Sequence, residues 1–351
     1  MFRNCTYPAL KGGLLALLAA ILFGLSTPVL QRLGQGVGPL STAALLYVGA
    51  AGVAWTSRRS AAREAGITRQ DVPRLLAMAV TGAVIGPVAL AWGLQHTSGS
   101  SASLMLTLEA VFTAVLAWRW YGESMDKRVA LAVLLLLAGG LVLVMAQGVG
   151  GQVRLWGLLA VMLATLAWGV DNTLSRGVAE RDPAQVVGVK AVLGALCTGA
   201  LAALLNEPLP EATRAAGLLA VGATGYGLSL RFYLLAQRTF GAARTGSVFA
   251  FAPFIGALGA LAWGERLGGW PMLLAGVLML AGVVLHLTEV HAHEHTHDMM
   301  DHEHAHRHDD GHHDHVHQPM PVGMHSHGHA HQRLTHTHPH VPDGLHGHGH
   351  G

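Results

Sequence analysis

Four ionisable residues lie inside long apolar stretches of the chain, and they are the first guide to its chemistry. They are Glu109, Asp171, Lys190 and Arg231. Placing one charge at the centre of a bilayer costs about 2.5–3.5 kcal/mol on insertion scales, so such a residue needs a partner or a function. We therefore take these four residues, with Asn172 beside Asp171, as candidates for a substrate cavity or for coupling.

Asp171 has two candidate partners. Asp171, Lys190 and Arg231 are expected at one depth, in the cytoplasmic third of the membrane. In one interpretation Asp171 pairs with Lys190 or Arg231 only to neutralise buried charge and fix helix register. In the other, compatible interpretation the same groups line a water-filled cavity and bind substrate. Asn172 is expected to form a hydrogen bond across helices.

Glu109 is different, because no cation is expected at its own depth. A carboxylate isolated in a low-dielectric cavity can exchange protons near neutral pH. Our hypothesis is that Glu109 is a proton-coupling or cation-binding carboxylate. The alternative is a hydrogen bond to a neighbouring hydroxyl, such as that of Ser103 or Thr107.

Histidines form the second chemical group, because 22 of the 24 in the chain lie in residues 291–350. Most alternate with other residues. The candidate metal ligands are His291, His293, His295, His297, His302, His304, His306, His308, His312, His313, His315, His317, His325, His327, His329, His331, His336, His338 and His340.

The chemistry of imidazole predicts which ions this tail binds. Imidazole suits Zn, Cu, Ni and Co, with no built-in choice among them beyond the Irving–Williams order. The tail has no apolar face to offset the entropy of folding, so we expect it to be disordered when it is free of metal. No cofactor is expected to be required. The alternative is a solubilising tail without a role.

The elements that must position these residues are membrane-spanning helices. Residues 1–288 contain ten apolar stretches of about 20 residues, enough to cross a hydrocarbon core about 30 Å thick. Backbone groups in lipid must be satisfied within the segment, which favours helices. The expected spans are 12–31, 38–57, 75–94, 98–118, 129–147, 155–175, 184–205, 215–237, 245–264 and 268–288.

The chain is internally duplicated. Residues 95–123 match residues 237–265 at a constant offset of 142, with identities that include Gly99/Gly241 and Glu123/Glu265. A second match, at an offset of 145, relates the segments that begin near Gly12 and Gly157. With five spans in each half, the second half must enter the bilayer from the opposite side. The sequence thus predicts inverted repeats, an arrangement found in transporters.

Charged residues at the span ends predict the orientation. With a cytoplasmic N-terminus, 14 Lys and Arg residues fall inside and four fall outside. This asymmetry predicts that both termini lie in the cytoplasm. We expect a multi-pass protein of the bacterial inner membrane. The formal net charge of +2 gives no indication of nucleic-acid binding, and two cysteines form no disulfide framework.

The paired segments resemble the EamA-type branch of the drug/metabolite transporter superfamily. The resemblance covers residues 10–288 and is most specific in TLEAVFTAVLAW with YGES in the first half, and in FAPFIGALGALAWGER in the second. Family members often carry proline where this chain has Ala110, so the expected proline kink concerns only Pro253. The resemblance implies transport of a small metabolite or drug.

Together these observations predict an all-α membrane protein with ten helices in two inverted five-helix repeats and a disordered tail. The expected domains are residues 1–148, 149–290 and 291–351. The first interpretation is a secondary transporter of a small solute with a metal-binding tail. The alternatives are a divalent-metal exporter and a membrane-anchored metal sensor or store. Expected partners are lipid, substrate and metal ions, with a homodimer as an option; no nucleophile–base pair or phosphate loop points to an enzyme.

Overall fold

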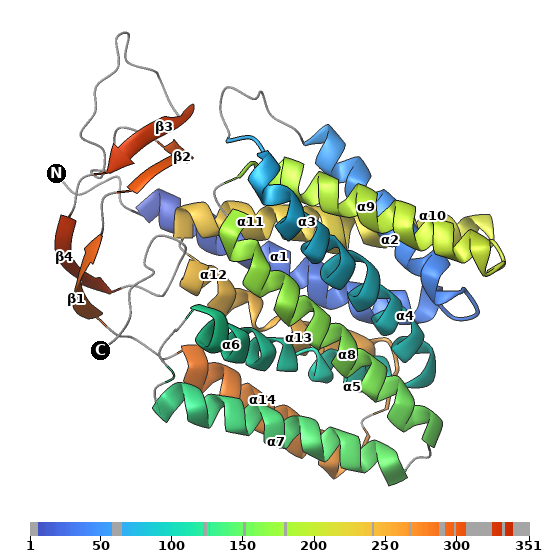
Figure 1. The fold of residues 1–351 in the computed structure, drawn as a ribbon. Coiled ribbons are helices and arrows are strands. Elements are labelled where there is room, and N and C mark those ends of the chain that lie inside the picture. The colour runs from blue at the N-terminus through green and yellow to red at the C-terminus, as the bar shows by residue number, and fades with distance from the viewer. Residues whose placement is uncertain are drawn as a thin grey trace.

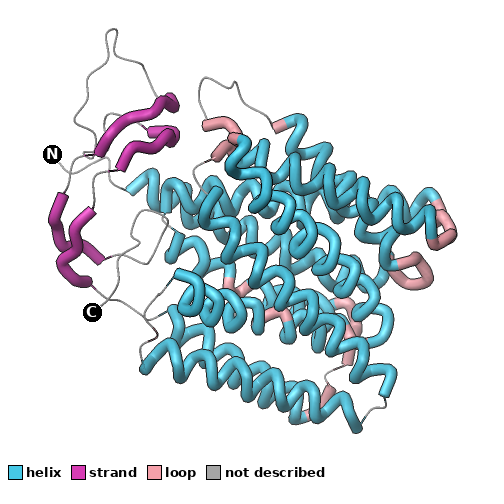
Figure 2. Tube along the Cα trace, in the orientation of Figure 1, coloured by secondary structure: helices cyan, strands magenta, loops and turns pink. Residues whose placement is uncertain are grey.

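The structure is a computed structural model. It describes residues 6–57, 65–121, 125, 127–149, 152–178, 181–240, 242–266, 268–287, 292–297, 300–306, 325–331 and 334–339. The helices form a single bundle, and the strands lie beyond the end of the bundle where α1 begins (Figures 1 and 2).

The described helices fall into two halves that follow the repeat. The first half contains α1 (Thr6–Leu33), α2 (Pro39–Thr56), η2 (Arg69–Asp71), α3 (Val72–Met78), η3 (Ala79–Ile85), α4 (Gly86–His96), α5 (Gly99–Met105), α6 (Leu108–Tyr121) and α7 (Lys127–Val149). The second half contains α8 (Gln152–Ser175), η4 (Arg176–Val178), α9 (Pro183–Leu204), α10 (Ala212–Val221), η5 (Gly222–Leu228), α11 (Ser229–Phe240), α12 (Ala242–Phe249), α13 (Ala252–Ala262) and α14 (Trp270–Leu287).

Length and hydropathy identify these helices as membrane spans. Within the described residues, eight continuous helical segments are long and apolar enough to cross a membrane, and Ala252–Ala262 and Trp270–Leu285 are shorter apolar helices. The outer surface is apolar as well: on α7, Leu134 and Leu141 are 61% and 59% exposed. Such a surface is stable only against lipid, which agrees with the spans expected from the sequence.

The packing obeys a pseudo-two-fold relation between the halves. The first helix of each half packs against the end of the third span of the other half, α1 on α11 and α8 on α4. The second helices pack against each other, α2 on α9, and the last helices form the peripheral pair α7 and α14 (Figure 1). Two inverted five-helix repeats are therefore the architecture of the protein.

The third span of each half contains a π-helical segment, which the sequence did not predict. Segments η3 and η5 are seven residues long and related by an offset of 143. In each, an amide bonds the carbonyl five residues earlier, Gly86 to Thr81 and Ser229 to Thr224. The Thr-Gly dipeptides 81–82 and 224–225 mark both segments. π-Bulges are rare and occur frequently at functional sites.

The fourth span of each half is broken in the middle, between α5 and α6 and between α12 and α13. In the second half Pro253 follows the break and has no amide hydrogen to donate. The first half breaks without proline: the Thr107 hydroxyl donates to the Leu104 carbonyl at 2.6 Å, and the Thr107 amide donates to the same carbonyl. The expectation of a kink at Pro253 alone was therefore incomplete, because a threonine hydroxyl competes for the backbone.

Four short strands are described within the histidine-rich tail. They are β1 (Ala292–His297), β2 (Met300–His306), β3 (His325–His331) and β4 (Leu334–Pro339). β1 pairs with β4 and β2 with β3, both antiparallel. Two-stranded ribbons are marginally stable in water, so composition alone gave no signal for them.

Helix α2 tests the packing of the two halves. A Cβ added at Gly49 would lie 2.1 Å from the Leu219 carbonyl oxygen of α10, whereas one at Gly52 on the same helix meets nothing within 4 Å. We predict that Gly49→Ala lowers the melting temperature of the purified protein, because overpacking costs about 1–3 kcal/mol. Gly52→Ala is the matched control and should leave the melting temperature unchanged or slightly higher. Equal effects of the two substitutions would contradict the close helix approach.

Candidate functional site

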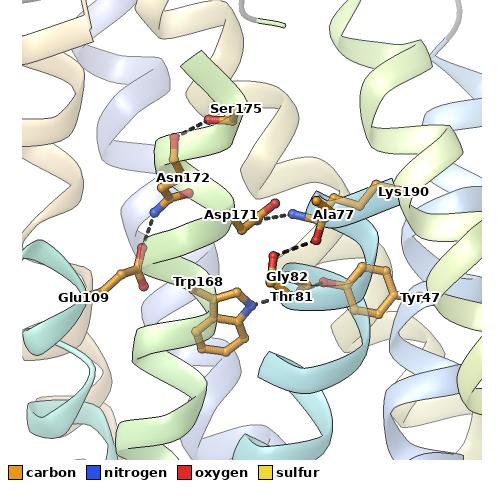
Figure 3. Close-up of polar contacts among 10 residues, drawn as sticks. All are labelled: Tyr47, Ala77, Thr81, Gly82, Glu109, Trp168, Asp171, Asn172, Ser175 and Lys190. Atoms are coloured by element: carbon orange, nitrogen blue, oxygen red, sulfur yellow. Dashed lines mark hydrogen bonds and ion pairs between the residues drawn. The ribbon is translucent and has the colours of Figure 1, made fainter. Parts of the chain in front are cut away.

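The polar centre of the bundle is built around the C-terminal part of α8. Adjacent residues Asp171 and Asn172 point in different directions, Asp171 toward α9 and Asn172 toward α6 (Figure 3). Because consecutive residues of a helix are about 100° apart, one helix can thus supply two separate polar contacts.

The first contact is a buried ion pair. Lys190 of α9 donates to Asp171 Oδ2, and the two residues are only 6% and 5% exposed. The pair lies against Gly82 of η3, where an added Cβ would approach Asp171 Oδ2 to 2.3 Å and Lys190 Nζ to 2.7 Å. Of the two partners that the sequence offered Asp171, the structure selects Lys190. The other oxygen, Oδ1, has no hydrogen-bond partner among the described residues.

The carbonyl of Gly82 is a second feature of this centre. It accepts hydrogen bonds from Tyr47 Oη at 2.6 Å and from Trp168 Nε1 at 3.0 Å (Figure 3). In a π-helix this carbonyl would bond the residue five positions later, which is Pro87, and proline has no amide hydrogen. Two side chains from other helices therefore satisfy the backbone group that the proline leaves free.

The ion pair is found in one half, although both halves contain the same glycine position against which its acidic residue lies. At an offset of 145, Asp171 corresponds to Ser26. Ser26 lies against Gly225 of η5 as Asp171 lies against Gly82, since a Cβ added at Gly225 would be 2.5 Å from Ser26 Cβ. The fold is pseudo-symmetric, but the charges are not.

The second contact joins Glu109 of α6 to Asn172, whose side-chain nitrogen donates to Glu109 Oε1 (Figure 3). The alternative considered for Glu109 was a hydrogen bond to a neighbouring hydroxyl, such as that of Ser103 or Thr107, and the structure shows the Asn172 amide as the partner instead. The Thr107 hydroxyl bonds the Leu104 carbonyl of its own helix, and Ser103 Oγ has no partner within the described chain. An amide thus orients the carboxylate, and no described cation pairs with it.

The exposure of Asn172 shows that the core is open at this depth. Asn172 is exposed, although Val161 and Thr165 lie within about 20° of it on α8 and are 0% exposed. Leu163, on the opposite side of the helix, is 49% exposed and faces the exterior. A polar residue that is exposed on the inward side of a helix marks an opening into the bundle.

Arg231 does not join either contact. It is half-buried on α11 and makes no hydrogen bond or ion pair with any residue that the structure describes. Ser229 and Tyr233 flank it and face other elements: the Ser229 hydroxyl bonds the Ala19 carbonyl, and the Tyr233 ring contacts the Phe249 ring. The predicted shared site of Asp171, Lys190 and Arg231 is thus limited to the first two.

Aromatic rings extend from the polar centre through the bundle. The Phe23 ring centroid lies 6.0 Å from those of Trp168 and Tyr226 and 5.5 Å from that of Phe249. Tyr47 contacts Tyr226 at 5.9 Å. The sequence analysis did not identify Tyr47 or Phe23, because neither side chain carries a charge.

The opposite end of the bundle is tied shut by two carboxylates of the second half. Glu265 accepts the amides of Gly99 and Ser100 at 2.7 and 2.9 Å, at the start of α5. Glu207 accepts the amides of Leu40 and Ser41 at 3.2 and 2.7 Å, at the start of α2. Carboxylates at helix N-termini satisfy free amides and interact favourably with the helix dipole.

The broken helices confirm that the two ends differ. At the tied end α5 packs on α13, and a Cβ added at Gly256 would lie 2.8 Å from Ser103 Oγ. Their counterparts at an offset of 142 are Ala114 and Thr245, on α6 and α12. Over the described residues α6 and α12 do not pack to a comparable extent. The same repeated surface is therefore closed at one end and parted at the other.

The tail histidines are described only in part. Twelve of the predicted ligands lie on or at the ends of β1–β4: His293, His295, His297, His302, His304, His306, His325, His327, His329, His331, His336 and His338. The others, His291, His308, His312, His313, His315, His317 and His340, lie outside the described residues. Among the residues that the structure describes, no group of three or more His, Cys, Asp or Glu side chains is arranged to hold a metal ion.

Two inverted halves, helices broken in mid-membrane and a polar opening between them define a membrane transporter. The chain matches the EamA-like transporter family over residues 10–145 and 155–288, one match for each half, and it belongs to that family. Its members are transporters and not enzymes, and the resemblance seen in the sequence is confirmed.

Two known proteins are similar to this chain. An uncharacterized transporter of Methanothermobacter thermautotrophicus is 27% identical over 292 residues, which cover 76% of this chain and 83% of that protein. A crystal structure with 19% sequence identity superposes with a TM-score of 0.58, over 78% of this chain and 94% of that chain. At that identity the likeness concerns the fold alone.

The buried ion pair yields a prediction about stability. Lys190→Met leaves the Asp171 carboxylate buried without a partner, so we expect the free energy of unfolding to fall by about 3–5 kcal/mol. Arg231→Met is the matched control and should cost much less, because the Arg231 side chain makes no hydrogen bond or ion pair with a described residue. The double variant Asp171→Asn/Lys190→Met should recover most of the loss. Denaturant unfolding measures all three, and an Arg231→Met loss as large as that of Lys190→Met would contradict the pairing.

Proposed function

We propose that the protein is a secondary transporter that moves a small organic solute, a metabolite or a drug-like compound, by alternating access. The observation that carries the proposal is the exposed Asn172, paired with Glu109, on the inward side of α8. The charge asymmetry of the sequence supports an inner-membrane location with both termini and the open end in the cytoplasm.

Alternating access is supported by a difference between two helix pairs that the repeat makes equivalent. The tied end uses α5 with α13, and the open end has their repeat counterparts α12 and α6 apart. In inverted-repeat transporters the two halves rock around a central site. The outward-facing state would then part α5 from α13, release Glu265 from the α5 amides, and bring α6 against α12.

The chemistry of the open centre favours an organic solute. Glu109 supplies a carboxylate, Asn172 an amide, and the rings around Phe23 an apolar surface that accommodates a carbon skeleton. Such a site suits a compound that carries a protonated amine. The same carboxylate could instead bind a proton when the compound leaves. A pathway for transition metals needs several His, Cys or carboxylate ligands, and the described helices contain no such group.

The histidine tail has a separate role in this proposal, as a cytoplasmic binder of divalent metal. It acts as a buffer or regulator and does not supply the cargo. Ending the chain before His291 distinguishes this role from a metal exporter. A solute transporter keeps its transport activity without the tail, whereas an exporter that collects metal through the tail loses tolerance to Ni, Co or Zn salts.

Glu109 is the residue that tests the transport proposal. In liposomes that contain a trapped pH indicator, a pH gradient is imposed and a panel of amino acids and organic cations is added. The solute with the largest wild-type signal is then used throughout. We predict that Glu109→Gln abolishes gradient-driven uptake, because the amide cannot exchange a proton.

The matched control is Glu211→Gln, an exposed carboxylate whose side chain does not cap α10. It should transport as the wild type does. Full gradient-driven uptake by Glu109→Gln would overturn the coupling role of Glu109. A panel without any protein-dependent signal would count against an organic solute.

A further inference from the structure

Many contacts between the two halves come in pairs that the repeat relates, but the contact between the fourth spans does not. Because the halves have the same fold in opposite orientation, an exchange of their roles turns one end of the protein from open to closed. A contact whose repeat counterpart is also present is therefore expected in both states. A contact without its counterpart belongs to one state and must break in the other.

The second spans, α2 and α9, form the first contact that is kept. They lie side by side (Figure 1), and their contact is its own counterpart under the repeat. A Cβ added at Gly199 would lie 3.8 Å from Ala44 Cβ, and one added at Gly188 would lie 3.4 Å from Ala54 Cβ. The two helices are therefore in close contact toward both of their ends.

Each second span also packs against the third span of the other half. On α2, a Cβ added at Gly49 would lie 2.1 Å from the Leu219 carbonyl oxygen of α10. On α9, a Cβ added at Gly194 would lie 2.7 Å from Ala83 Cβ of η3. Gly49 and Gly194 are repeat counterparts at an offset of 145, so both members of this pair of contacts are present.

Polar groups provide the same link at the two ends of the bundle. At one end, Arg214 at the start of α10 donates to the Gln35 carbonyl, in the loop before α2. At the other end, Asp71 before α3 pairs with Arg181, in the loop before α9, with 2.9 Å between Asp71 Oδ2 and Arg181 Nε. Asp71 and Arg214 are 143 residues apart, which is also the offset between η3 and η5 in the same spans. In each half the start of the third span is thus linked to the loop before the second span of the other half.

The fourth spans behave differently. α5 packs on α13, whereas their counterparts α12 and α6 have no comparable packing over the residues that the structure describes. Each fourth span nevertheless packs on the first span of the other half, α13 on α1 and α6 on α8, so these contacts do have counterparts. The contact of the fourth spans with each other is therefore the one expected to change.

Both fourth spans also contain a place to bend. Each is broken in the middle, between α5 and α6 and between α12 and α13. Residues at the ends of such elements are the usual hinges of a conformational change. One half of a broken span can therefore move while the other half keeps its partners.

We propose that α2, α9 and the starts of the third spans, α3 and α10, form a fixed frame that keeps its contacts in every state, and that the fourth spans separate and meet beside it. The inference rests on the alternating access of the proposed function and deepens it, since it names the moving parts. Glu207 follows α9 and accepts amides of α2, so it joins two parts of the frame and stays bonded. Glu265 accepts amides of α5 and is released when α5 leaves α13.

The first test cross-links the frame in full-length protein whose Cys5 and Cys197 are replaced by serine. The pairs are Ala44→Cys/Gly199→Cys and Ala54→Cys/Gly188→Cys, because disulfides join Cβ atoms about 3.5–4.5 Å apart. Each variant is oxidised in liposomes, and gradient-driven uptake of the solute chosen above is measured before and after reduction. We expect equal uptake in the two conditions. Loss of uptake on oxidation that reduction restores would overturn the fixed frame.

The matched cross-link joins the fourth spans. Gly99→Cys/Glu265→Cys replaces the contact between α5 and the residue that follows α13, where a Cβ added at Gly99 would lie 3.1 Å from Glu265 Oε1. A short bifunctional methanethiosulfonate reagent replaces the length of the Glu265 side chain and is removed by reduction. We expect the bridged protein to lose gradient-driven uptake and to regain it on reduction. Unchanged uptake by the bridged protein would contradict the role of the fourth spans as the moving parts.

The second test does not depend on transport. Nitroxide labels at Val48 on α2 and Leu196 on α9, two exposed apolar positions, report the distance across the frame by double electron–electron resonance. A single distance is expected, because both helices belong to the frame. Two distances would overturn the frame, whatever the uptake measurements give.

The two tests distinguish the frame from the proposed function. A single distance across the frame, together with no uptake by the wild-type protein, would support the frame and contradict transport of an organic solute. Wild-type uptake that is lost reversibly in the oxidised frame variants would contradict the frame and leave transport in place.

Discussion

The structure depends on one constraint: a backbone polar group within the membrane must find its partner inside the protein. Helices satisfy the constraint automatically, and in the first half the departures from the helix are matched by specific groups. Pro87 leaves the Gly82 carbonyl without its π-helical donor, and Tyr47 and Trp168 replace it. At the ends of spans, Glu207 and Glu265 accept amides that begin helices of the other half. The polar centre and the closed end therefore arise from the same requirement.

Duplication explains why these solutions come in pairs, and divergence explains why they differ. Both third spans contain a π-helical segment and both fourth spans are broken, yet one break uses the Thr107 hydroxyl and the other Pro253. The place occupied by Asp171 in one half is occupied by Ser26 in the other. Equal backbones with unequal side chains give a protein whose two ends can exchange shape while its charges stay on one side. This is the physical basis of the alternating access that we propose.

The sequence predicted the fold well because hydropathy, repeat offset and span number are all long-range patterns. It also identified Glu109 and Asp171, because a charge in an apolar stretch stands out. It could not choose between Lys190 and Arg231, which are equally deep, since helix rotation decides that choice. It missed Tyr47 and Gly82, whose roles come from a backbone carbonyl that only the π-helical register leaves free.

The most direct test of the account is to measure both ends of the bundle in one membrane sample. Spin labels at His96 and Ala262 report on the tied end, and labels at Ala117 on α6 and Gly246 on α12 report on the open end. The account predicts two populations for each pair of labels, with the two distances changing in opposite senses. In the state where the labels at the tied end are close together, those at the open end are far apart, and the reverse holds in the other state. A single rigid distance for both pairs, or distances that lengthen together, would contradict the exchange of shape between the two halves.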